Sequence, residues 1–182
     1  KQIMLSEAYQ MSSLGQDNAL EIDPENNFFW RFDMRRLAAE EIRDSILNLT
    51  GKLNLQMRGP SIYTPVPEVI LATASRPHAA WGNSPEDQQN RRSVYVYIKR
   101  SLHEPLLKTF DMADTDSACA VRFTTTVPTQ ALTMLNSEFL NDQAEAFANR
   151  IEADAETPRE QIAQARRLST SREPELTESD QG

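Results

Sequence analysis

The sequence has one cysteine, few aromatic side chains and no long apolar run. Cys119 has no second cysteine with which to form an internal disulfide, and aromatic residues make up 7% of the 182 positions. No apolar run approaches the roughly 18 residues that a membrane-spanning helix requires. The 19 lysines and arginines are outnumbered by 27 aspartates and glutamates, which gives a formal net charge of −8. This shortage of positive charge argues against nucleic-acid binding, which relies on neutralising phosphates.

Signatures of known chemistry are also missing. The chain contains no G-x-S-x-G, P-loop, dinucleotide or zinc-protease motif, and no Cys-x-x-Cys-His haem attachment motif. His78 and His103 are isolated in the sequence and lack a clear third ligand, so zinc is not expected. The chain starts at Lys1 without a secretion signal. We therefore expect a piece of a larger protein, with any shared site completed by other segments.

Apolar residues at helical spacing predict a mainly α fold of about five helices. The clearest helix spans residues 34–50, with Asp33 as its N-cap and Gly51 as the left-handed residue that ends it. Its apolar stripe is formed by Ala38, Ala39, Ile42, Ile46 and Leu49. The other predicted helices are residues 3–9, 24–30, 104–110, 128–154 and 159–168.

A small two-stranded β element completes the predicted fold. Residues 93–98 alternate β-branched and aromatic side chains, and residues 121–127 are the only plausible partner strand. Residues 52–90 contain prolines and glycines that predict a long irregular loop. We expect one helical domain over residues 1–168, followed by a polar, disordered tail at residues 169–182.

Several segments in a fixed order carry a family resemblance. They are Asp23-Pro24-Glu25-Asn26 with Phe29-Trp30-Arg31, Arg35-Arg36-Leu37-x-Ala39-Glu40-x-Ile42-Arg43-Asp44-Ser45, Gly59-Pro60-Ser61, Arg91-Arg92-Ser93-x-Tyr95-x-Tyr97-x-Lys99-Arg100, Phe110-Asp111 and Thr126-x-Pro128-x-Gln130-Ala131-Leu132-x-Met134-Leu135-Asn136. From about Leu5 to Ile162 the chain resembles an uncharacterised C-terminal domain family of large exported planctomycete proteins. Such proteins often carry an upstream cytochrome-c-like domain.

The resemblance implies a cellular context and no catalytic residues. It implies a periplasmic or extracellular location, with upstream domains of the same protein as the first partners. Any haem would belong to an upstream domain, and we expect no cofactor in this chain.

The helix at residues 34–50 carries the catalytic candidates Glu40, Asp44, Arg35 and Arg43. Glu40 and Asp44 are four residues apart and share a helix face, where two carboxylates can raise one another's pKa for acid–base work. Arg43 and the neighbouring arginines equally predict an ordinary polar network between helices, which is the favoured interpretation.

Two further groups are binding candidates. Basic and aromatic side chains are interspersed at residues 91–100. This pattern suits the binding of an anionic polysaccharide or of an acidic neighbouring domain, and it equally suits an edge strand whose charges prevent aggregation. The binding candidates are Arg91, Arg92, Tyr95, Tyr97, Lys99, Arg100 and, in the loop, Trp81.

Asp111, Asp114 and Asp116 are calcium candidates, although their spacing matches no EF-hand and turn formation is favoured. For Cys119, a small buried thiol is favoured over a nucleophile.

Three functions stay open on these residues. The leading hypothesis is a non-enzymatic interaction or scaffolding module of an exported, cytochrome-associated multidomain protein. The alternative is the C-terminal part of a polysaccharide-active or redox enzyme whose active site is shared with an upstream domain. A carbohydrate-binding module that uses Trp81 and the tyrosines of residues 93–98 is a minor alternative.

Overall fold

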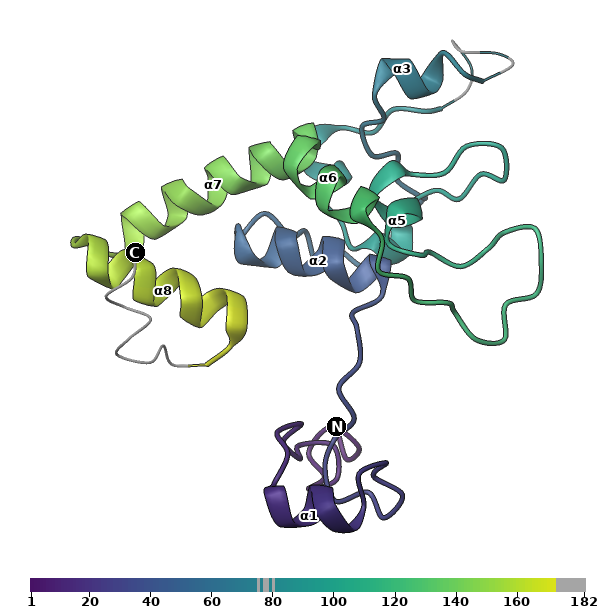
Figure 1. Cartoon of the computed structure of the whole chain (residues 1–182). Coiled ribbons are helices and arrows are strands. Elements are labelled where there is room, and N and C mark those ends of the chain that lie inside the picture. The colour runs from purple at the N-terminus through teal and green to yellow at the C-terminus, as the bar shows by residue number, and fades with distance from the viewer. Residues whose placement is uncertain (75, 77–78, 80, 173–182) are drawn as a thin grey trace. The chain divides into compact units, whose positions relative to one another are not determined.

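The computed structural model describes residues 1–74, 76, 79 and 81–172 (Figure 1). The chain divides into two compact units, Lys1–Arg36 and Leu37–Gly182. Within the described residues the secondary structure is mainly helical, which confirms the predicted fold class. The elements are α1 (Asp17–Ile22), α2 (Ala39–Leu49), α3 (Glu68–Leu71), α4 (Glu86–Gln89), the 3-10 helix η2 (Ser93–Tyr95), α5 (Pro105–Thr109), α6 (Pro128–Asn136), α7 (Glu138–Asp154) and α8 (Pro158–Thr170). Residues 173–182 of the predicted tail, and His78, lie outside the described residues.

The first unit corrects two predicted helices. Residues 3–9 form turns, and residues 24–30 form turns and irregular backbone where a helix was expected. Asn26 and Phe29 adopt positive φ angles of 58° and 54°, which a right-handed helix does not contain. Asp23 does accept hydrogen bonds from the following backbone, at Asn27 N and Phe28 N, but these bonds close a turn. The same side-chain chemistry serves helix caps and turns, so it did not separate the two.

Helix α2 begins five residues later than the sequence predicted. The carboxylate of Glu41 accepts a hydrogen bond from Ala38 N at 2.8 Å, which is the return half of a capping box. Ala38 has extended backbone angles and has no side-chain oxygen to supply the other half. The predicted end is confirmed, because Gly51 adopts φ 73° immediately after the last turn.

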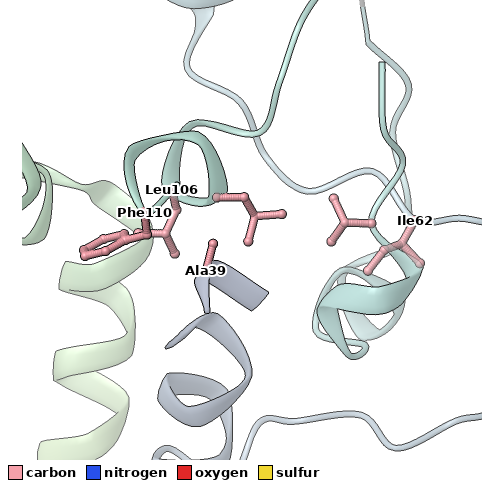
Figure 2. Close-up of a cluster of buried hydrophobic side chains, with 6 residues drawn as sticks. Ala39, Ile62, Leu106 and Phe110 are labelled. Atoms are coloured by element: carbon pink, nitrogen blue, oxygen red, sulfur yellow. The ribbon is translucent and has the colours of Figure 1, made fainter. Parts of the chain in front are cut away.

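The core of the second unit forms where α2 meets α5. Ala39 at the start of α2 packs with Leu106, Leu107 and Phe110, as Figure 2 shows for the labelled side chains. Ile62, from the irregular segment between α2 and α3, belongs to the same buried cluster. Apolar burial is the main favourable term in folding, so this cluster anchors α2, α5 and the irregular segment together.

The predicted pairing of residues 93–98 with residues 121–127 is wrong. Ser93–Tyr95 form the 3-10 helix η2, and the next residue, Val96, makes an isolated parallel bridge with Ile62. The bridge consists of Ile62 N to Tyr95 O and Tyr97 N to Ile62 O, both 2.8 Å. Its partner therefore lies in the predicted loop, residues 52–90, which is mostly irregular and contains only short helices in its described part. In residues 121–127 the side chains of Val121 and Phe123 are exposed.

The predicted helix at residues 128–154 is two helices, α6 and α7. The backbone of Ser137 is extended, with ψ 124°, and ends α6 before α7 starts. Helix α8 agrees with its prediction, since Thr157 and Glu160 form a capping box around Pro158. In the second unit α6 contacts α5 and α7, while α2 contacts α5 and α7 (Figure 1). None of the helices in the described residues has both the length and the apolarity needed to cross a membrane.

Candidate functional site

A cavity of about 900 Å³ opens among the helices of the second unit. Its wall is formed by residues of α2, α3, α4, the first turn of α5, α6 and the start of α7, together with irregular backbone at residues 64–67. This volume lies in the range of small-molecule and cofactor sites, about 300–1,000 Å³. Charged lining side chains are Arg43, Lys52, Glu68, Glu86, Glu104, Glu138 and Asp142. The cavity therefore brings charged groups from several elements of the second unit together.

Arg43 lies on the cavity wall and is 2% exposed. Its guanidinium donates to Arg91 O at 3.0 Å, to Ser93 Oγ at 3.2 Å and to Gln89 O at 2.6 Å. Burial lowers the pKa of the guanidinium, whereas the charges of Glu104 and Asp44 raise it. An arginine stays protonated in such surroundings, so a positive charge is held between α2 and the backbone of residues 89–93.

Glu104 is the second buried charged group on the cavity wall, 8% exposed. It is the N-cap of α5, where its Oε2 accepts a hydrogen bond from Leu107 N at 2.6 Å. Pro105 follows at the first helical position. Burial raises the pKa of the Glu104 carboxyl, while the hydrogen bond from Leu107 and the charge of Arg43 oppose the rise. A carboxyl with a raised pKa at a cavity wall can donate a proton or bind a cation.

The raised pKa of Glu104 makes a prediction for stability against pH. The unfolded carboxyl ionises near its ordinary pKa of about 4.3, and the folded carboxyl ionises at higher pH. Between these two values only the unfolded chain releases the proton, so folding is progressively destabilised as pH rises and then levels off. One proton gives a slope of at most about 1.4 kcal/mol per pH unit.

The variant Glu104→Gln should remove this decline, because glutamine resembles the protonated acid and keeps an oxygen for Leu107 N. We expect the variant to gain stability relative to the wild type as pH increases from 4 to 8. Urea unfolding of both proteins across this range measures the difference. A difference that is constant with pH, or that has the opposite sign, would contradict the raised pKa.

The sequence did not identify Glu104 as a site residue. Its only local signal is Glu-Pro at the start of a predicted helix, which is a capping pattern. Burial in the folded chain raises the pKa of this carboxyl, and the charge of Arg43, which is far away in the sequence, opposes the rise. No spacing rule joins these two residues.

The other predicted catalytic residues are not gathered at the cavity. Glu40 forms an exposed ion pair with Arg122, with 2.5 Å between the carboxylate and the guanidinium. Asp44 accepts hydrogen bonds from the backbone N and the Oγ of Ser93, both at 2.7 Å, and lies 3.9 Å from Arg43. Arg35 is exposed in the first unit and donates to Arg36 O. Arg43 alone of the four lines the cavity.

Arg91 is the most buried of the candidate binding residues. It is 1% exposed, lies 3.9 Å from the centre of the Tyr95 ring and donates to Pro60 O and Arg58 O. The side chain therefore ties residues 58–60 to residues 91–95. Other members of this group are more exposed: Arg92 and Lys99 are half-buried, and Arg100 is exposed and 3.6 Å from Asp116.

Trp81 belongs to an aromatic cluster with Tyr63 and Tyr97. Its ring meets Tyr63 edge-on at 5.6 Å and Tyr97 at 6.0 Å, and its Nε1 donates to Thr64 O at 2.8 Å. Tyr97 is 37% exposed. These contacts hold the irregular segments together, and a role in sugar binding stays a prediction.

The calcium candidates take part in turns. Asp111 accepts hydrogen bonds from Thr125 N and Oγ1, and Asp114 accepts from Asp116 N and Ser117 Oγ. Across the described parts of the chain, no three or more His, Cys, Asp or Glu side chains are grouped to hold a metal ion. Cys119 is exposed, which corrects the expectation of a buried thiol, because residues 113–127 run without regular structure over the surface.

The chain matches the model of a known protein family. The model of a family described as PSD1, protein of unknown function (DUF1553), matches residues 1–182. No curated protein and no solved structure matches the chain.

Proposed function

The chain belongs to the PSD1 family of unknown function (DUF1553), and on that premise we propose that it is a non-enzymatic interaction module. It would bind another domain of the same protein through the surface around α6. The observation that carries this proposal is the imbalance between buried and exposed apolar side chains. Among the described residues, large hydrophobic side chains that stay exposed outnumber the hydrophobic side chains that are buried.

Single exposed apolar residues are ordinary on a protein surface, but contiguous ones mark interaction sites. Helix α6 is the clearest case, because Leu132 and Leu135, which are neighbours on one helix face, are 55% and 72% exposed. The opposite side of α6 is held by Gln130, which is buried and donates to Thr109 O and Thr125 O. The exposed leucines therefore lie on a helix that is anchored from the other side.

The apolar surface of α6 continues into the cavity. Leu132 is both a lining residue and an exposed one, and Thr129, Thr133 and Asn136 line the cavity beside it. Apolar and polar groups thus meet at one edge, as they do in protein interfaces with an apolar centre and a polar rim. A partner lying on α6 would cover the mouth of the cavity.

The double variant Leu132→Gln, Leu135→Gln tests the proposal, since leucine and glutamine have similar helix propensities. In this chain alone the change should alter the free energy of unfolding by no more than about 0.5 kcal/mol, because both side chains are exposed. Amide hydrogen exchange of α6 should be at least about tenfold slower in the proposed multidomain protein, called the longer protein below, than in this chain alone. The double variant should abolish that extra protection.

Leu55→Gln is the control, because Leu55 is 67% exposed and lies outside α6 and the cavity wall. It should leave the protection of α6 intact. If the amides of α6 exchange equally fast in the chain alone and in the longer protein, the interaction surface is not α6 and the proposal fails.

The cellular setting of the module is part of the proposal and rests on the sequence resemblance. We propose a periplasmic or extracellular multidomain protein of planctomycete type, with the module positioned beside upstream domains. A cytochrome-c-like domain would carry the haem, because this chain has one cysteine and lacks the two-cysteine attachment motif. Detection of covalent haem in the purified longer protein, by its absorption spectrum after denaturation, tests this association.

A second candidate function has its own observation. Glu104 combines burial, a raised pKa and a position on the cavity wall, which are the properties of a general acid. We propose as the alternative that the chain forms part of a polysaccharide-active enzyme whose site an upstream domain completes. Loss of polysaccharide turnover in the longer protein carrying Glu104→Gln, with unchanged unfolding at pH 4, supports this alternative; unchanged turnover removes it.

A further inference from the structure

We propose that the cavity beside α6 receives the lysine or arginine side chain of a protein segment that lies across Leu132. This inference deepens the interaction function, because it names the chemistry of the partner at that surface. Three features support it: the excess of carboxyl groups on the cavity wall, the hydrogen bonds that already occupy Arg43, and the apolar edge formed by α6.

Carboxyl groups outnumber cationic groups on the cavity wall. The carboxyl groups are Glu68, Glu86, Glu104, Glu138 and Asp142, and the cationic groups are Arg43 and Lys52. In the part of the chain that the structure describes, no ion pair within 4.0 Å involves any of these five carboxyl groups. Clefts lined by one sign of charge attract ligands of the opposite sign.

The charge of Arg43 offsets part of this negative charge, because it acts on Glu104, but its guanidinium is engaged with the protein. Its Nη1 donates to Arg91 O and Ser93 Oγ and its Nη2 to Gln89 O, and its side chain is almost fully buried. Lys52 is the other lining cation, and it is exposed. A cationic group entering the cavity would meet Glu104 on the wall and the carboxylates of α3, α4 and α7 around it.

Glu104 is suited to hold such a cation. Its Oε2 is fixed by Leu107 N, so the carboxyl is oriented before any ligand arrives. A buried carboxylate is costly, and an ammonium or guanidinium group in the cavity would add to the charge of Arg43 in reducing that cost. A preoriented acceptor also lowers the entropy lost on binding.

The apolar edge favours a protein segment over a sugar. Sugar sites use exposed aromatic faces, whereas the one aromatic lining residue, Phe139, is half-buried with Arg43 5.7 Å from its ring centre. Leu132 instead offers an aliphatic surface at the mouth. Aliphatic and basic side chains occur together in proteins, so one segment could occupy both places.

Short peptides measure this preference directly. The probe is acetyl-Leu-Ala-Lys-Ala-Leu-amide, compared with the peptides in which norleucine or glutamate replaces the lysine, in a fluorescence-anisotropy titration at low salt. We expect the lysine peptide to bind about tenfold tighter than the norleucine peptide, because norleucine keeps the stem and lacks the charge. The glutamate peptide should bind weakest of the three.

Two variants locate the effect. Glu104→Gln should reduce the preference for lysine over norleucine by about fivefold or more, because the oxygen that caps α5 is retained and the charge is lost. Glu145→Gln makes the same charge change on the exposed surface of α7 outside the cavity, and should leave the preference unchanged.

Equal binding of the lysine and norleucine peptides overturns the inference, and so does the absence of binding by all three. Either result on the wild type decides the matter even if Glu104→Gln does not fold. Failure here is distinct from failure of the interaction function, since protection of α6 in the longer protein does not depend on which side chain enters the cavity.

Discussion

Replacing Arg43 with methionine is expected to destabilise the protein by about 3–5 kcal/mol. The substitution keeps an unbranched apolar stem but removes three hydrogen bonds to Arg91 O, Ser93 Oγ and Gln89 O. These acceptors are buried or partly buried, so their desolvation is no longer compensated. Small domains have about 5–15 kcal/mol of stability in total, so most of it would be lost. Urea unfolding of the purified chain measures the change.

Arg122→Met is the matched control for Arg43→Met. Arg122 also pairs with a carboxylate, that of Glu40, but its side chain is 42% exposed. Exposed ion pairs contribute roughly 0–1 kcal/mol, because water and salt screen the charges. A loss of less than about 1 kcal/mol for Arg43→Met, or equal losses for both variants, would show that the buried guanidinium does not hold residues 89–93 to α2.

The second large effect is expected at Leu107, which is 1% exposed in the cluster of Figure 2. Leu107→Ala removes buried methyl groups and leaves a void between α5 and α2, at a cost of about 2–5 kcal/mol. The free energy of unfolding, from urea titration or thermal melts, gives the magnitude.

Leu135→Ala makes the same chemical change at a side chain that is 72% exposed. In this chain alone it should shift the unfolding free energy by no more than about 0.5 kcal/mol. Comparable losses for Leu107→Ala and Leu135→Ala would mean that the cluster around α5 is not the core.

The sequence predicted helix ends well where both partners of a contact are close along the chain. Gly51 ends α2 because a left-handed residue is needed there, and glycine adopts that conformation without a steric penalty. Thr157 and Glu160 begin α8 because their side chains bond each other's backbone. Such signals are complete within a few residues, so no knowledge of the fold was required.

Predictions failed where a local pattern permits two outcomes. The alternating side chains at residues 93–98 are equally compatible with a strand and with η2 followed by one bridge. In the structure Val96 forms that single bridge with Ile62, from the irregular segment. The helical stripe at residues 128–154 continues across Ser137, although the backbone there is extended. Periodicity indicates which side chains would share a helix face, and it does not report where the chain turns.

The candidate site also combines features that are local in the sequence with features that depend on tertiary contacts. The sequence by itself determined that the chain is mainly helical, acidic and without a recognised catalytic motif, because these are properties of composition and short-range spacing. Only the tertiary structure placed Arg43 against the backbone of residues 89–93, and brought Glu104 and the exposed Leu132 of α6 to the cavity wall. The desolvation that raises the pKa of Glu104 comes from packing between distant segments. A side chain's burial is a property of everything that surrounds it, and those surroundings exist only after the chain has folded.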